Sequence, residues 1–232
     1  RYVDALQYLS SKSSIVFDSQ DSFNQFKSLK KDFTNCTIIN TGVDTNYFSP
    51  SSKKRLTRSL KLICISEFEE RKGIQYLIKA FPTILNKLDA TLKIYGSGRY
   101  KTFYHTLIND LCLNEKIKIK EPVKCTKAPL KDADIYFLLS EGEGFPMGLL
   151  EAMACGIPAI TSNLPPFDEI DSDVIYKVDR NNEIDICTAL EKFNDEAYYE
   201  TISKISREYV EKNHSWVKIA QEYYLYVVDE NE

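Results

Sequence analysis

The feature that most constrains the fold is an alternation of short apolar segments with longer segments of helical period, repeated along most of the chain. The apolar segments are rich in β-branched residues, which favour strands. Between them, apolar residues recur at the spacing that places them on one face of a helix. This alternation predicts an α/β fold with a doubly wound parallel sheet. The expected strands are Ser14–Phe17, Thr37–Ile39, Leu60–Ile65, Thr91–Tyr95, Ile117–Ile119, Ile135–Leu139, Ala159–Thr161 and Val174–Val178.

The clearest helical segment follows the strand expected at Leu60–Ile65. Its apolar stripe comprises Ile74, Leu77, Ile78, Phe81, Leu85 and Leu88. Pro82 lies inside this segment and has no N–H to donate, which predicts a kink. In parallel sheets ligands bind at the carboxyl ends of the strands. The loops that follow the expected strands are therefore where a functional site is expected.

Two carboxylates stand in one such loop and in the helix after it. Glu143 and Glu151 have seven residues between them, and the apolar segment 152–155 followed by Gly156 indicates a short helix that contains Glu151. Backbone N–H groups at the start of a helix favour an anion because the peptide dipoles are aligned. Carboxylates accept hydrogen bonds from hydroxyl groups. A ligand that is part phosphate and part polyol, such as a nucleotide-sugar, fits this corner.

The segment 143–162 reads Glu-Gly-Phe-Pro-Met-Gly-Leu-Leu-Glu-Ala-Met-Ala-Cys-Gly-Ile-Pro-Ala-Ile-Thr-Ser. It resembles the donor-site motif of the family 4 retaining glycosyltransferases, which have the GT-B fold. Paired glutamates alone are more typical of a solvated helix face, and the flanking residues make the match specific. The resemblance implies that Glu143 contacts hydroxyls of the donor sugar, so Glu143 is the candidate catalytic residue, and that Glu151 holds the ribose. It also implies the Rossmann-like C-terminal half of a GT-B fold.

The resemblance assigns the backbone of the same loop to the donor. The candidates for N–H contacts with sugar or phosphate are Phe145, Met147 and Gly148, because Pro146 has no N–H. Gly144 and Gly148 would let a ligand approach the backbone closely, although a tight turn explains such glycines equally well.

The loop after the strand expected at Leu60–Ile65 resembles the family's Arg-x-x-x-x-Lys-Gly segment, whose cations hold the diphosphate. Lys72 and Gly73 match it, whereas Glu67 stands at the position of the arginine. A carboxylate about 6 Å from a diphosphate costs roughly 3 kcal/mol per charge at an effective dielectric near 20. We therefore expect Glu67 to point away or to weaken the site. Arg71 is a candidate for the missing charge, and an ordinary solvated helix start is the alternative.

Three other segments were weighed as ligand contacts. Gly96-Ser97-Gly98 lacks the third glycine and the acidic ribose ligand of a dinucleotide site, so we interpret it as a structural turn. Val123 lies in the segment that aligns with the family's base-contacting loop, where Glu121 replaces the usual glycine and leaves the base open between UDP and GDP. Glu169 matches a glutamate near the rim of the donor site, and we interpret it as a structural cap.

The same comparison divides the chain into four parts. The segment Thr41–Pro50 resembles the Asn-Gly-Val-Asp-x-x-x-Phe-x-Pro exit from the first GT-B domain, with Thr41 in place of the asparagine. The start at Arg1 indicates a piece of a longer protein. The expected parts are the tail of the N-terminal domain at 1–48, a polar linker at 49–59, the nucleotide-sugar-binding domain at 60–213, and a C-terminal helix at 214–232 that crosses back toward the first domain.

The composition excludes some classes of function and indicates a cellular compartment. The net charge of −4 argues against a nucleic-acid binder. Six dispersed cysteines and only two histidines indicate a reduced, cytoplasmic protein without a zinc site. A peripheral association with a membrane is left open. The Asp-x-Asp sequence at 171–173 is expected in a surface turn. Metal-independent transfer is expected because preorganised dipoles and a lysine stabilise a leaving diphosphate.

The expected function is retaining transfer of a hexosyl group from a UDP- or GDP-sugar to a glycan, lipid or other acceptor, with no cofactor besides the donor. The acceptor would bind mainly to the missing N-terminal domain, so we expect this chain alone to be inactive. A non-catalytic GT-B partner or chaperone subunit is one alternative, kept open by Glu67 and Glu121. A sugar-nucleotide epimerase of the same fold is another. The sugar, the base, the acceptor and the oligomeric state stay open.

Overall fold

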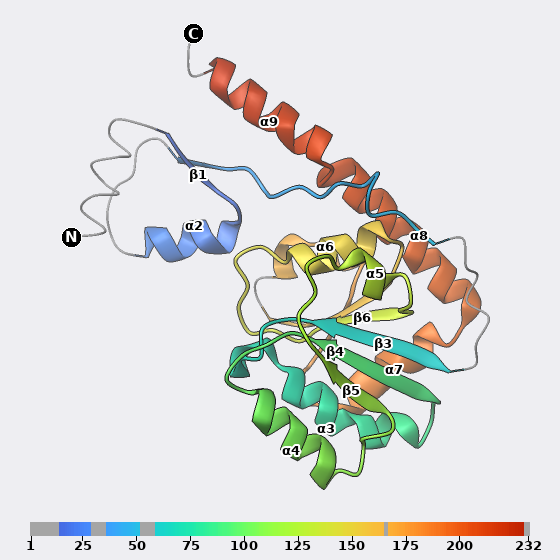
Figure 1. Ribbon diagram of the computed structural model, residues 1–232. Coiled ribbons are helices and arrows are strands. Elements are labelled where there is room, and N and C mark those ends of the chain that lie inside the picture. Colours follow the sequence, from blue (N-terminus) through green and yellow to red (C-terminus); the bar gives the residue numbers. More distant parts are fainter. Residues whose placement is uncertain (1–13, 29–35, 52–58, 165–166, 230–232) are drawn as a thin grey trace.

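The computed structural model describes residues 14–28, 36–51, 59–164 and 167–229 (Figure 1). Its centre is a sheet of six strands, all parallel, in the order β5-β4-β3-β6-β7-β8. The predicted doubly wound α/β fold is confirmed. The strands are β3 (Leu60–Ile65), β4 (Ala90–Tyr95), β5 (Ile117–Lys120), β6 (Ile135–Leu138), β7 (Ala159–Ser162) and β8 (Tyr176–Val178).

Helices cover both faces of this sheet (Figure 1). One face carries α3 (Ile74–Leu85), α4 (Lys101–Asp110) and α7 (Glu183–Phe193), and the other carries α5 (Lys127–Leu130) and α6 (Met147–Ala154). The long helix α8 (Glu196–Asn213) packs against both α6 and α7, and α9 (Trp216–Asp229) follows it. Two short 3₁₀ helices, η1 (Glu70–Lys72) and η2 (Phe167–Glu169), lie in loops.

The core consists of two apolar layers, one on each face of the sheet. Side chains along a strand alternate between the two faces, and β6 shows this directly. Ile135 and Phe137 pack with α3 and α7, whereas Tyr136 and Leu138 pack with α6. All four are buried. Burial on both faces explains why these strands read as continuous apolar runs in the sequence.

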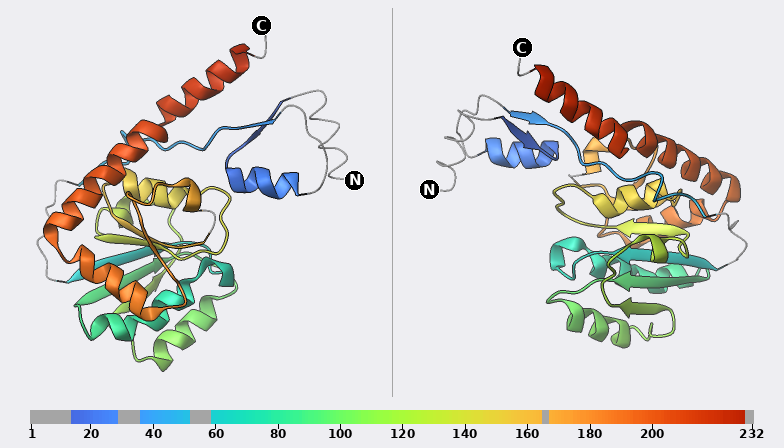
Figure 2. Two further views of the ribbon diagram at one scale, coloured as in Figure 1. Left: turned by 180° about the vertical axis from the view of Figure 1, so that it is seen from behind. Right: turned by 45° about the horizontal axis from the view of Figure 1, so that its top comes forward.

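A smaller unit precedes the main sheet. β1 (Ile15–Phe17) and β2 (Cys36–Ile38) pair in parallel, and α2 (Gln20–Lys27) lies between them in sequence. Ser19 caps α2 by accepting a hydrogen bond from the N–H of Ser22. Figure 2 shows α9 leaving the main body toward the side on which this unit lies. Among the described residues, no helix has both the length and the apolar character that a membrane span requires.

The eight predicted strands are all present, with ends that differ by one or two residues. The largest difference is at β8, which begins at Tyr176 because Val174 closes a turn through a hydrogen bond from its N–H to Asp171 O. The helix α3 continues through Pro82, since packing on its buried face outweighs the lost hydrogen bond. Most of the predicted linker, residues 52–58, lies outside the described residues. The domain boundaries stay predictions.

Candidate active site

The candidate site lies where the winding of the sheet reverses. Strands β3 and β6 are neighbours, but the helices that follow them, α3 and α6, cover opposite faces. The loops after the two strands start at the carboxyl ends, where the winding reverses, and this is the usual ligand position in such sheets. Lys72 follows β3 and Glu143 follows β6. Their side chains meet there, with Lys72 Nζ 2.6 Å from Glu143 Oε2.

This ion pair is almost completely shielded from water. The side chains of Lys72 and Glu143 are only 10% and 11% exposed. Glu143 also accepts a hydrogen bond on its other oxygen, Oε1, from Ser140 Oγ at 2.5 Å. A buried ion pair is tolerated only when its remaining hydrogen-bonding positions are satisfied. The site therefore holds one cation and one carboxylate, each neutralised by the other until a ligand replaces the contact.

Gly73 allows the two loops to approach this closely. It ends η1 in the left-handed conformation, with φ of 72°, which other residues adopt only with strain. A Cβ at this position would lie 2.1 Å from the carbonyl oxygen of Leu139. Any side chain would push the end of β6 away from Lys72. The close packing of the two loops thus explains why a glycine follows the lysine in the predicted Lys-Gly segment.

The start of α6 lies next to Glu143. Pro146 is its N-cap and α6 begins at Met147. The N–H of Met147 donates to Phe145 O at 2.9 Å, so it is already engaged. Among the described residues, the N–H groups of Phe145 and Gly148 have no backbone acceptor. Of the three predicted amide contacts, these two are the ones available to a ligand, and the Met147 contact would require the turn to open.

Glu151 lies one turn further along α6, half-buried. Thr126 Oγ1 donates to its Oε2 at 2.6 Å. Burial raises the pKa of Glu151, and the hydrogen bond from Thr126 lowers it in part. Thr126 follows the loop that contains Val123, which is itself half-buried. Thr126 was missed in the sequence, because nothing in its type or spacing distinguishes it from other threonines.

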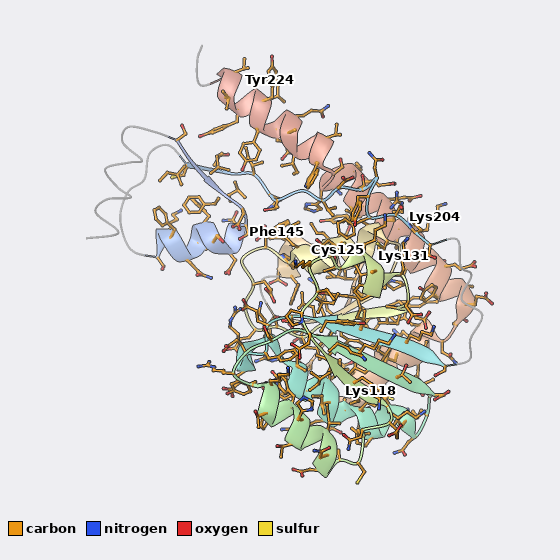
Figure 3. All side chains as sticks on the ribbon, in the orientation of Figure 1. Lys118, Cys125, Lys131, Phe145, Lys204 and Tyr224 are labelled. Carbon is orange, nitrogen blue, oxygen red and sulfur yellow. The ribbon has the colours of Figure 1, made fainter. Side chains whose placement is uncertain are left out.

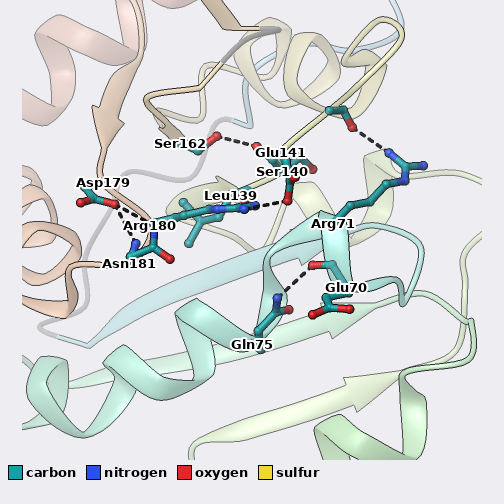
Figure 4. A network of polar contacts seen from close by, with 11 residues as sticks. Glu70, Arg71, Gln75, Leu139, Ser140, Glu141, Ser162, Asp179, Arg180 and Asn181 are labelled. Carbon is teal, nitrogen blue, oxygen red and sulfur yellow. Dashed lines mark hydrogen bonds and ion pairs between the residues drawn. The ribbon is translucent and has the colours of Figure 1, made fainter.

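Arg71 is turned toward the loop after β6 (Figure 4). Its Nη1 donates to Gly142 O at 2.7 Å, and its Nη2 lies 3.6 Å from Glu67 Oε2. The side chain of Glu67 is 72% exposed. The carboxylate that replaces the expected arginine therefore faces solvent and partly neutralises Arg71.

The family model described as "Glycosyl transferases group 1" matches residues 48–223, more than half of the chain. The chain belongs to this family. A relative is the N-acetyl-alpha-D-glucosaminyl L-malate synthase of Bacillus anthracis, 28% identical over 70% of this chain and 43% of its own length. Another is the GDP-mannose-dependent monoacylated alpha-(1-6)-phosphatidylinositol monomannoside mannosyltransferase of Corynebacterium glutamicum, 27% identical over 87% of this chain and 58% of its own length. The chain thus spans about half the length of these relatives.

Solved structures show the same fold. The Anabaena protein Alr3699/HepE, determined with UDP and glucose, superimposes with a TM-score of 0.85 at 17% identity, over 97% of this chain and 66% of that one. The predicted Rossmann-like fold of the GT-B glycosyltransferases is confirmed. The group 1 glycosyl transferase match covers residues 48–223, so Lys72 and Glu143 both lie inside it.

Three residues from the other candidate ligand-binding segments have structural roles in this glycosyl transferase. A Cβ on Gly96 would lie 1.9 Å from Ser66 O, so the Gly-Ser-Gly turn is needed for packing. Glu121 forms an ion pair with Lys101 at 2.5 Å. Glu169 accepts a hydrogen bond from the N–H of Asp21 in the first turn of α2, which is the cap that we expected.

Within the described ranges, no group of three or more His, Cys, Asp or Glu side chains is arranged to hold a metal ion. Metal-independent transfer stays a prediction for this glycosyl transferase. The residues 171–173 lie in a turn in which the N–H of Asp173 donates to Asp171 Oδ1. The six cysteines are all unpaired as thiols.

Proposed function

We propose that the protein to which this chain belongs is a retaining glycosyltransferase that transfers a hexosyl group from a UDP- or GDP-sugar, and that this chain supplies the donor site. The observation that carries the proposal is the shielded ion pair between Lys72 and Glu143 at the reversal of the sheet. A cation next to a carboxylate suits a sugar diphosphate, because the cation can bind the diphosphate while the carboxylate accepts hydrogen bonds from the sugar hydroxyls. The start of α6 adds N–H groups for an anion.

Each residue has a role in this proposal. Lys72 binds the diphosphate together with the N–H groups of Phe145 and Gly148. Gly73 lets the loop that carries Lys72 come close to the loop after β6. Glu143 accepts hydrogen bonds from sugar hydroxyls and is the candidate catalytic group. The remaining donor-binding candidates are Glu151 for the ribose, the Val123 loop for the base, and Arg71, Gly144 and Met147 at the rim.

Bond cleavage in this site depends on stabilising the leaving nucleoside diphosphate. Lys72 and the amide N–H groups are held in place before the donor arrives, so they need little reorganisation when negative charge develops on the leaving oxygen. Glu143 holds the sugar at its hydroxyls and keeps its anomeric carbon in position. No metal is required in this scheme, and we expect activity of the whole protein to survive chelation by EDTA; loss restored by a divalent cation would contradict it.

The wider assignments rest on the relatives. Both relatives named above are synthases or transferases, which favours transfer over epimerisation or a non-catalytic partner role. The acceptor would bind mainly to the part of the protein outside this chain, since the chain spans about half of those relatives. Unpaired thiols at all six cysteines support a reducing, cytoplasmic compartment.

Calorimetric titration with UDP, GDP and their common sugar conjugates tests the donor site. We expect one nucleotide to bind, and Glu151→Ala to weaken it at least tenfold, since loss of a charged acceptor is worth about 1.5–3 kcal/mol. Glu191→Ala is the control, because Glu191 is an exposed carboxylate on α7 that pairs only with Lys87 among the contacts described. Absence of binding to every nucleotide, in this chain and in the whole protein, would overturn the proposal.

A further inference from the structure

Arg180 is a buried cation that none of the roles above uses. It follows β8 at the carboxyl edge of the sheet, and only 9% of its surface is exposed. Lys72 is the other lysine or arginine that is buried among the described residues. Figure 4 shows the guanidinium of Arg180 directed toward Leu139 and Glu141, which follow β6.

The guanidinium joins three parts of the fold. Its Nη1 donates to Leu139 O at 3.4 Å, and its Nη2 donates to Glu141 Oε2 at 2.8 Å. Its carbon lies 4.9 Å from the centre of the Tyr76 ring on α3, within cation–π distance. Arg180 thus ties the loop after β8 to α3 and to both ends of the turn Leu139–Glu141.

The rest of this turn is held from outside as well. Ser162 Oγ donates to Ser140 O at 2.6 Å. The N–H of Glu141 donates to Arg71 O at 2.8 Å, and Arg71 Nη1 donates to Gly142 O at 2.7 Å. Each residue from 139 to 142 therefore has a contact from another element. The next residue is Glu143.

Stability alone gives a poor reason for this arrangement. Burial of a charge offsets much of the attraction to its partner, and the partner Glu141 is 63% exposed. In addition, Nε of Arg180 is buried and has no hydrogen-bond partner within the described ranges. A cation that contributes little net stability yet makes two directed hydrogen bonds is suited to fixing geometry.

We propose that Arg180 is a positioning residue, which fixes the turn at residues 139–142 and so directs Glu143 toward the sugar of the donor. The proposal rests on the proposed function. Arg180 acts through the turn and does not contact the ligand. Its loss should therefore weaken the contacts with the sugar half of the donor without weakening those with the nucleotide half, because Lys72, Gly148 and Glu151 are carried by other segments.

The first test compares the affinity for the free nucleoside diphosphate with that for its sugar conjugate. In Arg180→Met we expect the preference for the conjugate to fall at least tenfold, because a misplaced contact can cost up to about 100-fold. The free nucleotide should bind no more weakly than to the wild type. Arg180→Lys keeps the charge and should recover part of the preference. Lys177→Met is the matched control, because Lys177 is on β8 itself and pairs with Asp168 outside the turn. Equal weakening of both ligands, or an unchanged preference, overturns the proposal.

The second test needs no ligand. Hydrogen exchange of amides 139–145 should accelerate at least tenfold in Arg180→Met, while exchange in β4 and α4 stays as in the wild type. If the wild-type protein binds no nucleotide, the proposed function fails, and this measurement still decides whether Arg180 holds the turn. Unchanged exchange in the turn contradicts the role. If Arg180→Met does not fold, Glu141→Gln replaces it, because this variant weakens the same contact. Hydrogen exchange in the turn should then accelerate by a smaller factor.

Discussion

At the scale of single residues, the two opposite charges of the site bind each other before a ligand arrives. Lys72 and Glu143 neutralise each other at 2.6 Å. A free nucleoside diphosphate that takes Lys72 leaves Glu143 without its cation and close to more negative charge. An intact donor brings hydroxyls that replace the lost contact. The pair should therefore discriminate between the donor and the nucleotide product.

This argument predicts opposite effects of Glu143→Gln on two ligands. The free nucleoside diphosphate should bind about tenfold more tightly, equivalent to roughly 1.4 kcal/mol, because Lys72 is no longer held by a carboxylate. The sugar conjugate should lose most of its advantage over the free nucleotide. Calorimetry on wild type and variant measures both. Weaker binding of the free nucleotide by the variant would show that Glu143 does not compete for Lys72.

Glu151 provides a second residue-scale prediction, on stability and pH. Burial raises the pKa of Glu151, so the folded state holds its proton more tightly than the unfolded chain, where the pKa is about 4.3. Below that value both states are protonated and the group has no effect. As the pH rises through the folded-state pKa, the folded state becomes destabilised relative to a neutral side chain.

Glu151→Gln should therefore melt at a higher temperature than wild type at pH 7, because the variant has no buried charge at this position. The difference should disappear near pH 4. Nucleotide binding should fall in the same variant. Thermal denaturation across this pH range tests the sign, and a variant that is less stable at pH 7 contradicts it.

At the scale of elements, the strands and the helix α6, which follows Glu143, were predictable from the local pattern of apolar residues. Buried parallel strands are continuous apolar runs, and α6 ends where Gly156 requires a left-handed turn, with φ of 70°. Lys72 and Glu143 are 71 residues apart, and only the resemblance to the glycosyltransferase donor site assigned both of them to one site. Arg180 and Thr126 were not predictable, since a buried cation and a half-buried hydroxyl look like solvated ones until tertiary contacts are known.

The packing of α6 on β6 supplies an element-scale prediction. A Cβ on Gly148 would lie 2.6 Å from the hydroxyl of buried Tyr136, which donates to Ile65 O at 3.2 Å. Gly148→Ala should cost about 1–3 kcal/mol of unfolding free energy, as overpacking does. Tyr136→Phe removes the obstructing oxygen, so the double variant should be more stable than the sum of the single effects predicts, by about 1 kcal/mol or more. Urea denaturation of all four proteins measures this coupling, and strict additivity would refute the contact.

At the scale of the whole molecule, α9 carries several large apolar side chains that are exposed. Figure 3 shows Tyr224 projecting from this helix. Apolar surface of this extent on one helix is typical of an interaction site. The exposed residues are Trp216, Val217, Tyr223, Tyr224, Leu225, Val227 and Val228. We expect the part of the protein outside this chain to cover them, in line with the predicted crossing of the final helix.

This view predicts that binding and turnover separate between the chain and the whole protein. The chain should bind its nucleotide-sugar but form no transfer product, because we expect the acceptor to bind mainly outside this chain. The whole protein should bind the donor with similar affinity and turn it over. Product analysis with radiolabelled donor compares the two. Transfer by the chain alone would place the acceptor site within these residues.

The joint between Gly42 and Trp216 has a mechanical consequence. Val43 N–H donates to His214 O, Trp216 N–H donates to Val43 O, and Trp216 Nε1 donates to Gly42 O. The segment that follows β2 and the start of α9 are therefore fastened to each other here. Any rotation of the unit of β1 and β2 about this joint would have to break the hydrogen bond from the N–H of Asp21 to Glu169. It would also change the approach of Asp18 to the loop that contains Gly144, where a Cβ on Gly144 would lie 3.8 Å from the Asp18 carboxylate.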